Sequence, residues 1–154
     1  MTSRPTVVVL NGPNLNLLGE REPDIYGHET LADVAELCRV RTEELDMSLD
    51  FRQTNHEGIF IDAIHEVRHS AAGLVVNAGG WTHTSVAIRD ALAAVVAPVI
   101  EVHLTDVHAR EEFRHFSYIS DVALQVIVGR GPQGYVDAID TIANNAPDGL
   151  DEGD

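Results

Sequence analysis

The sequence predicts a three-layer α/β sandwich built on one parallel sheet of five strands. Short apolar runs, typical of strands buried on both faces, alternate with longer segments whose apolar residues recur at helical spacing. The chain has 154 residues, which suits one domain with one core. Alternating strands and helices favour a parallel sheet covered on both faces, and five-strand sheets of this kind usually have the order 2-1-3-4-5.

The amino-terminal third supplies a strand, a helix and a second strand. Residues 6–10 (TVVVL) form a β-branched run. Residues 30–45 have apolar side chains near helical spacing, and Thr30 followed by Asp33 resembles a capping box. Residues 49–53 form the second expected strand. The single Cys38 falls within the expected helix at residues 30–45, where packing in or near the core is its simplest role.

The middle of the chain continues the alternation. Residues 59–70 are expected to be helical, residues 74–77 (LVVN) form a third strand, and residues 85–96 form a helix that stops before Pro98. The apolar face expected for the earlier of these helices consists of Ile59, Phe60, Ala63, Ile64 and Val67.

The last third closes the fold. Residues 99–102 and 124–128 are the fourth and fifth strands, and residues 132–143 form the final helix, with proline near its first turn. We therefore expect a single catalytic domain over residues 1–143. Residues 144–154 contain proline, two glycines and four acids, which predicts an acidic, disordered tail.

Charge narrows the possible functions. The chain has 25 acidic and 10 basic residues and a formal net charge of −15, which argues against a nucleic-acid partner. All ten basic residues are arginine. Without lysine, the protein can form no Schiff base with a carbonyl substrate. It also cannot contain a Walker A phosphate loop, because that motif requires a lysine.

Three further observations favour a cytoplasmic protein. No run approaches the ~20 apolar residues of a membrane-spanning helix, and the apolar stretch near the start is too short for a signal peptide. One cysteine also allows no disulfide within the chain.

Residues capable of chemistry collect in the loops after the first, third and fourth strands, at residues 11–27, 77–85 and 101–118. In an open parallel sheet, ligands bind at the carboxyl ends of strands near the point where strand order reverses. The first loop is long and contains Arg21 and Tyr26, which suit a lid. Together the loops offer a tyrosine, arginines, histidines and amides, which suits an anionic substrate that needs a base and an acid.

Each of these residues also has a simpler interpretation. A loop tyrosine is usually surface, and a histidine after a strand is more often structural. Arg110 and Arg114 are positioned to pair with Glu111 on a short helix.

Two other patterns are weaker. The string GRGPQG at residues 129–134 satisfies a dinucleotide-binding pattern but lies in the last strand–helix unit rather than the first. The spacing of the histidines fits no compact zinc site, and no cysteine is near them; the histidines concerned are His83, His103, His108 and His115.

From about residue 7 to residue 142, the chain resembles the type II 3-dehydroquinate dehydratases. The motifs that carry the resemblance are NGPNLNLLG, REP and YG in the first loop, NAGG and THTS in the second, and EVH and HAREEFR in the third. The resemblance implies a flavodoxin-like fold. It also implies conversion of 3-dehydroquinate to 3-dehydroshikimate by anti elimination through an enol or enolate, without metal, cofactor or Schiff base.

The resemblance implies that Tyr26 is the catalytic base. A free tyrosine with a pKa near 10 is a poor base at neutral pH, and a nearby guanidinium favours the phenolate. Arg21 matches the lid arginine credited with this effect, and Arg114 is the second candidate.

The remaining catalytic roles are also implied by the resemblance. Asn14 matches the residue that holds a water against the developing enolate, a task that suits a neutral amide. His103 matches the general acid that protonates the leaving hydroxyl, and Glu101 matches the carboxylate that orients it.

The resemblance further implies a substrate-binding set and an assembly. Asn77, His83 and Arg114 match positions that contact hydroxyls or the ring, and Leu104 and Thr105 match the turn that binds the substrate carboxylate. Arg110 belongs to the same motif, with a less defined role. Asp90 matches a position that reaches a neighbouring subunit's site, because the family forms trimers that assemble into dodecamers. The only other partner implied is the small-molecule substrate.

The chain departs from the family pattern at three positions. Thr105 and Asp106 stand where serine and asparagine are common, so Asp106 adds a negative charge near the expected carboxylate site. Trp81 is bulkier than expected. A non-catalytic binding module and a flavin or nucleotide binder at residues 129–134 stay open as alternatives, as does the choice between aromatic biosynthesis and quinate breakdown.

Overall fold

Five parallel strands form the middle layer, in the order β2-β1-β3-β4-β5, and this confirms the predicted order. The computed structural model describes residues 3–145. The strands are β1 (Thr6–Asn11), β2 (Ser48–Gln53), β3 (Gly73–Asn77), β4 (Val99–His103) and β5 (Gln125–Val128). In the register of the sheet, Asn11 lies between Gln53 and Asn77, so the carboxyl ends of β2, β1 and β3 are level.

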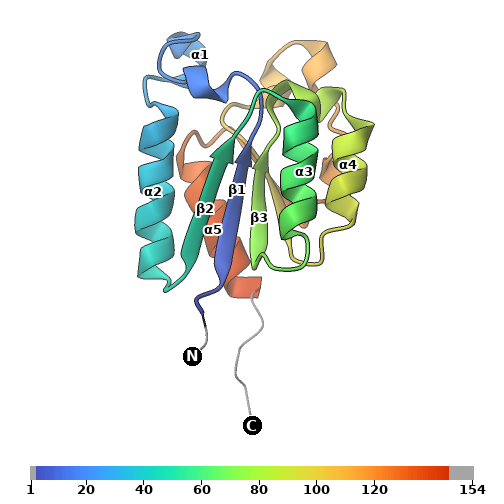
Figure 1. Cartoon of the computed structure of the whole chain (residues 1–154). Coiled ribbons are helices and arrows are strands. Elements are labelled where there is room, and N and C mark those ends of the chain that lie inside the picture. Colours follow the sequence, from blue (N-terminus) through green and yellow to red (C-terminus); the bar gives the residue numbers. More distant parts are fainter. Residues whose placement is uncertain (1–2, 146–154) are drawn as a thin grey trace.

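Helices cover both faces of the sheet, as Figure 1 shows. On one face lie α3 (Glu57–Val67) and α4 (Val86–Ala93), and on the other lie α2 (Leu31–Glu44) and α5 (Gln133–Asn145). The short helix α1 (Pro23–Tyr26) lies beyond the carboxyl ends of the strands (Figure 1). No helix within residues 3–145 is long and apolar enough to cross a membrane.

The local signals in the sequence have their expected structural counterparts. Thr30 and Asp33 form a reciprocal capping box at the start of α2. The Ser85 side chain caps α4 by accepting a hydrogen bond from the Ile88 amide. The helix expected to reach residue 96 ends at Ala93, three residues earlier than expected and five residues before Pro98.

One core prediction is wrong. Ile59 was expected on the buried face of α3, yet it is 55% exposed. The buried stripe begins at the next residue and follows positions i, i+3, i+4 and i+7, so Ile59 lies beyond its edge. The residues of this stripe are Phe60, Ala63, Ile64 and Val67.

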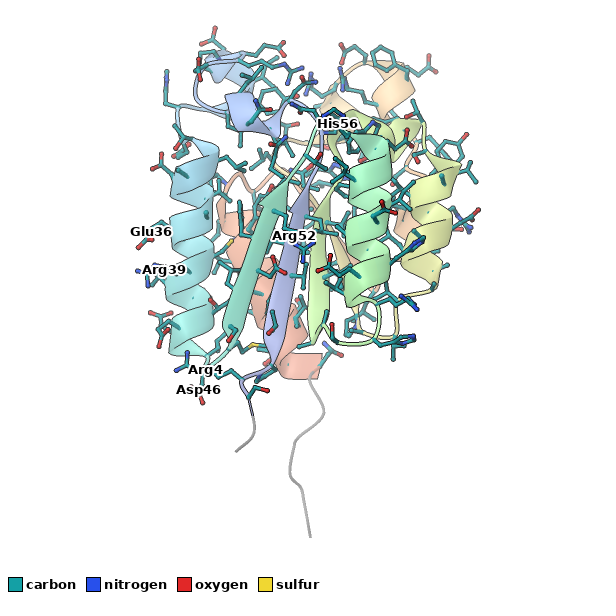
Figure 2. The ribbon with its side chains drawn as sticks, viewed as in Figure 1. Arg4, Glu36, Arg39, Asp46, Arg52 and His56 are labelled. Carbon is teal, nitrogen blue, oxygen red and sulfur yellow. The ribbon has the colours of Figure 1, made fainter. Side chains whose placement is uncertain are left out.

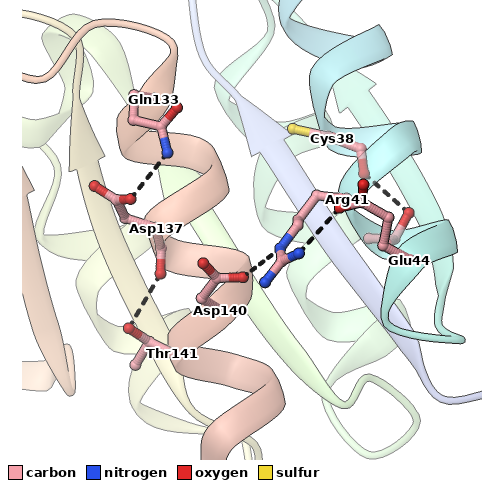
Figure 3. A network of polar contacts seen from close by, with 8 residues as sticks. Cys38, Arg41, Glu44, Gln133, Asp137, Asp140 and Thr141 are labelled. Carbon is pink, nitrogen blue, oxygen red and sulfur yellow. Dashed lines mark hydrogen bonds and ion pairs between the residues drawn. The ribbon is translucent and has the colours of Figure 1, made fainter.

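A polar link joins the two helices on one face. Arg41 on α2 donates to Asp140 on α5 over 2.6 Å and pairs with Glu44 over 2.9 Å (Figure 3). Cys38, one turn before Arg41, is fully buried, and burial raises the pKa of its thiol to about 12. The core role expected for Cys38 is confirmed.

Most arginines lie outside the loops of interest and pair with acids. Arg4 and Asp46 lie at the opposite end of the sheet from His56 (Figure 2), with a 2.9 Å contact, and Arg39 pairs with Glu36 over 2.7 Å. Exposed pairs of this kind add little to stability, because water screens both charges. The loops that follow β1 and β4 hold three other arginines: Arg21, Arg110 and Arg114.

The tail predicted from residue 144 is only partly described. Asn144 and Asn145 belong to α5, and residues 146–154 lie outside the described part of the chain.

Candidate active site

A cavity of about 160 Å³ opens at the carboxyl edge of the sheet, between the loops that follow β1, β3 and β4. Ten of the twelve predicted site residues line it: Asn14, Arg21, Tyr26, Asn77, His83, His103, Leu104, Thr105, Arg110 and Arg114. Of the other two, Glu101 is buried on β4 in contact with His103, and Asp90 lies on α4 outside this cavity.

Close packing between backbones holds the first loop, residues 11–27, at the edge of the cavity. The Gly12 amide donates to the Asn77 carbonyl over 2.8 Å. A Cβ on Gly12 would lie 2.4 Å from the carbonyl oxygen of Ala78, so only glycine fits. Asn14 adopts a left-handed conformation, with φ of 69°, and its amide donates to the Asn55 side chain over 2.9 Å. The structure thus adds Asn55, which has no motif around it, as a support for Asn14.

Tyr26 lies at the end of α1, beneath two guanidinium groups. Arg110 Nη1 donates to the Tyr26 hydroxyl over 3.0 Å, and this bond raises the pKa of Arg110 above its usual value. The guanidinium carbons of Arg21 and Arg110 lie 5.3 and 5.4 Å from the centre of the tyrosine ring. A cation in these positions stabilises negative charge on the phenol oxygen.

Arg110, rather than Arg114, is the second arginine at the tyrosine. The Nε of Arg114 instead donates to Glu111 over 2.7 Å, and its guanidinium lies 5.0 Å from the centre of the Phe113 ring. Arg110 makes only a long 3.7 Å contact with Glu111. Two separate 3-10 turns, rather than one helix, carry this segment, so a spacing of four residues does not give the two arginines one direction. The expectation for Arg114 as Tyr26's neighbour is therefore wrong.

His103 ends β4 and contacts a buried carboxylate. Its Nε2 bonds to Glu101, which is only 1% exposed. Glu101 also accepts hydrogen bonds of 2.8 Å from the hydroxyls of Ser117 and Ser120. Both carboxylate oxygens are therefore satisfied, and the histidine ring is held on one side. The two serines were not predicted, because nothing local distinguishes them from other loop serines.

The protonation state of Glu101 follows from these contacts. Burial by itself raises the pKa of this carboxyl, but the hydrogen bond and charge of His103 and the two serine hydroxyls together bring it below its usual value. Glu101 is therefore ionised at neutral pH. Because a carboxylate only accepts hydrogen bonds, His103 carries a proton on Nε2 and its Nδ1 is the ring nitrogen left for other partners.

His83 lines the cavity beside His103. Its ring stacks on that of His103 at 6.4 Å between centroids, and Nδ1 bonds to the Phe116 carbonyl over 2.8 Å. Partial burial lowers the pKa of His83. The ring is therefore neutral at pH 7, and Nδ1 donates to the carbonyl.

The glycine string at residues 129–134 supports the turn that follows β4. The Gly129 amide donates to the His103 carbonyl over 3.3 Å, and the Gly131 amide donates to the Leu104 carbonyl over 2.9 Å. Both glycines have positive φ, of 74° and 57°, which side chains rarely adopt. The string thus has a structural role beside the cavity.

Two of the departures from the family pattern point away from the cavity. The Asp106 side chain caps a 3-10 turn by accepting from the His108 amide over 3.0 Å, and it does not line the cavity. Trp81 packs edge-on against Phe60 with centroids 5.4 Å apart. Thr105 alone of the three lines the cavity.

Within residues 3–145, no three histidine, cysteine or acidic side chains gather closely enough to hold a metal ion. His103 is bonded to one such side chain, the carboxylate of Glu101. His108 likewise has one beside it, the ring of His115, at 5.8 Å between ring centroids.

The fold and the cavity define a flavodoxin-like α/β enzyme, whose cavity holds a tyrosine in contact with two arginines and a histidine bonded to a carboxylate. The family model described as "Dehydroquinase class II" matches residues 5–143. The chain belongs to this family.

Named relatives agree with the family model. A "3-dehydroquinate dehydratase 2" of Pseudomonas putida is 59% identical over 132 residues, which are 86% of this chain and 89% of that protein. A "Catabolic 3-dehydroquinase" of Pyricularia oryzae is 55% identical over 92% of each chain. The crystal structure of a type II dehydroquinase from Propionibacterium acnes is 40% identical and superposes with a TM-score of 0.87, covering 94% of this chain and all of that one.

Proposed function

We propose that this protein removes water from 3-dehydroquinate to give 3-dehydroshikimate, by anti elimination through an enol or enolate. The observation that supports the mechanism most directly is the Arg110–Tyr26 hydrogen bond of 3.0 Å in the same cavity as the carboxylate-bound His103. The two pairs supply a base and an acid to one substrate. The reaction occurs both in aromatic biosynthesis and in quinate breakdown.

In the first step, Tyr26 acts as a phenolate and takes a proton from the carbon next to the substrate ketone. Arg110 and Arg21 stabilise the phenolate before transfer. The electron pair of the C–H bond moves toward the ketone oxygen. Asn14, which lines the cavity, holds a water against that oxygen, where negative charge develops.

In the second step, the enolate expels the hydroxyl group and His103 protonates it, so that the group leaves as water. With Nε2 bonded to Glu101, the proton comes from Nδ1 of the imidazolium. His103 ends neutral, and the proton on Tyr26 returns to solvent or to His103 before the next turnover.

Substrate recognition falls to the remaining cavity residues. Thr105 and Leu104 bind the substrate carboxylate in the turn after β4. Asn77, His83 and Arg114 contact hydroxyl groups or the ring. All five line the cavity. The catalytic domain in this proposal is residues 1–143.

The proposal includes a cytoplasmic homododecamer built from trimers. Asp90, with a side chain 69% exposed on α4, would reach the site of a neighbouring subunit. Twelve chains of 16.8 kDa would have a mass of about 200 kDa. Light scattering on the active enzyme measures this mass, and an active monomer would contradict the assembly.

The activity itself is tested by the ultraviolet absorbance of the enone product. Purified protein should produce it from 3-dehydroquinate, in the presence of a metal chelator and after borohydride treatment with substrate. No turnover would leave a binding module that keeps the shape of the site. Turnover lost with chelator and restored by a divalent ion would overturn the metal-free mechanism.

A further inference from the structure

Tyr135 is a fully buried tyrosine that no step of the proposed reaction uses. It lies on α5, is 0% exposed, and is the largest completely buried side chain within residues 3–145. Burial raises the pKa of its hydroxyl, so the phenol is neutral and can both donate and accept a hydrogen bond. One of these two bonds reaches Asn77, which lines the cavity, and so connects Tyr135 to the site.

The two bonds connect the ends of neighbouring strands. The Tyr135 hydroxyl donates to Asn11 Oδ1 over 2.7 Å and accepts from Asn77 Nδ2 over 2.9 Å. Asn11 ends β1 and Asn77 ends β3, and the two residues are directly paired in the sheet. Asn11 and Asn77 are both buried, at 1% and 4% exposure, but only Asn77 lines the cavity.

The direction of each hydrogen bond in this series, from Arg52 through Asn11 and Tyr135 to Asn77, is determined from the Arg52 end. Asn11 Nδ2 donates to the Arg52 carbonyl over 2.9 Å, and a carbonyl can only accept. The Asn11 amide oxygen therefore faces Tyr135, which must donate its proton to it. With its proton committed, the Tyr135 oxygen can only accept from Asn77, and so the NH₂ group of Asn77 must face Tyr135.

The same sequence of bonds determines what Asn77 presents to a ligand. Its Oδ1 accepts from the Gly79 amide over 3.2 Å. An amide has two N–H donors and two oxygen lone pairs, so one donor and one acceptor position are left for a substrate hydroxyl. If the amide rotated by half a turn, its oxygen and nitrogen would exchange places and the pattern offered to the hydroxyl would reverse.

We propose that Tyr135 is a positioning residue, which holds the Asn77 amide in the one orientation that matches a hydroxyl of the substrate. The proposal rests on the proposed function for the identity of the ligand, but the orientation itself does not depend on turnover. Tyr135 does not touch the substrate, and its effect passes through Asn77.

The first test compares Tyr135→Phe with Thr42→Val. Each change removes one buried hydroxyl, and Thr42 donates to the Cys38 carbonyl over 2.9 Å in α2, away from the cavity. Tyr135→Phe should lower kcat/KM about tenfold, mainly through KM, since roughly one substrate hydrogen bond is weakened. Thr42→Val should leave kcat/KM within about twofold of the wild type. Equal kcat/KM values for the two variants would overturn the proposal.

A second test separates positioning from general loosening of the fold. Asn77→Ala already lacks the amide, so adding Tyr135→Phe should lower kcat/KM by less than about twofold more. Asn11→Ala lets the tyrosine donate in the other direction, and it should reduce kcat/KM although Asn11 is outside the cavity. If Tyr135→Phe does not fold, Asn11→Ala still tests the proposal. Additive effects in the double variant, or a fully active Asn11→Ala enzyme, would contradict the proposal.

A third measurement is independent of activity. The side-chain amide protons of Asn77 should exchange with solvent faster in Tyr135→Phe than in Thr42→Val, as followed by NMR on labelled protein. If the wild type turns over no 3-dehydroquinate, the proposed function fails while this comparison still decides the role of Tyr135. Equal exchange rates in the two variants would overturn the positioning role.

Discussion

The two walls of the cavity are built differently. The sheet wall consists of Asn77 and His103, which are buried at the ends of β3 and β4, with the buried Glu101 in contact with His103. The lid wall consists of Arg21, Tyr26 and Arg110, which come from loops, and no residue of α1 is buried. On the sheet wall, neighbouring groups hold each side chain before any ligand binds. On the lid wall, the base depends on guanidinium groups that also have acidic neighbours, such as Glu22 at 3.2 Å from Arg21.

This difference indicates how the two halves of the proposed reaction are arranged. The acid is preorganised by strands whose positions are set by the core, whereas the base is assembled from segments 84 residues apart in sequence. Changes to the sheet wall should therefore affect stability as well as activity. Changes to the lid wall should affect activity with little loss of stability.

The largest expected effect is on the lid wall. Tyr26→Phe keeps the ring and removes the hydroxyl, so it should lower kcat by about 10²–10⁴-fold with a much smaller change in KM. Thermal unfolding should be nearly unchanged, because Tyr26 is only partly buried. Near-normal kcat would remove Tyr26 from the mechanism.

On the sheet wall, His103→Ala should reduce kcat by about 10²–10³-fold, because the leaving hydroxyl loses its proton donor. It should also lower the melting temperature, since Glu101 loses one partner and is left as a buried carboxylate. Steady-state kinetics and calorimetry on one preparation measure both effects. Full turnover in this variant would exclude His103 as the acid.

The two arginines of the third loop form a matched pair. Arg110→Gln removes the cation bonded to Tyr26 and should reduce kcat about 10- to 100-fold, as expected for the loss of a charged hydrogen bond. Arg114→Gln removes a cation bonded to Glu111 and should mainly raise KM, by a few-fold. The opposite ranking of the two kcat values would restore Arg114 as the arginine that acts on the base.

Because Glu101 is a buried and ionised carboxylate beside the sheet wall, it should make the melting temperature depend on pH. Its pKa is lowered in the folded state, so on acidification the unfolded chain takes up this proton first, near the ordinary value of 4.5. The stabilisation is complete above that value and is lost as pH falls toward the folded pKa. Between about pH 5 and pH 3, the melting temperature of the wild type should therefore fall more steeply than that of Glu101→Gln. The exposed Glu57→Gln is the control, and equal slopes for wild type and Glu101→Gln would contradict the assignment.

The smallest effect is expected at Asp106. Asparagine caps a turn as well as aspartate does, and the Asp106 side chain is exposed and bonded to the His108 amide. Asp106→Asn should therefore change KM by no more than about twofold, because an exposed charge is well screened. A several-fold fall in KM at low salt, absent at high salt, would show that the carboxylate repels the substrate after all.

The sequence by itself determined the order of strands and helices, because β-branched runs, helical spacing and capping pairs are local signals. It also identified the three loops, because chemically distinctive side chains follow the ends of strands that a parallel sheet brings together, and the resemblance to the family named the ten residues of the cavity. Motifs extended this to the buried Glu101.

Only the tertiary structure decided which arginine meets Tyr26 and which groups hold the sheet wall. The bonds of Tyr135 span 124 residues to Asn11 and 58 residues to Asn77, and the hydroxyls of Ser117 and Ser120 reach back 16 and 19 residues to Glu101. Such bonds depend on strand register, on how α5 docks and on the direction of each turn. A hydrogen bond is lost when its geometry changes by about 1 Å, so no periodicity or spacing in the sequence specifies it.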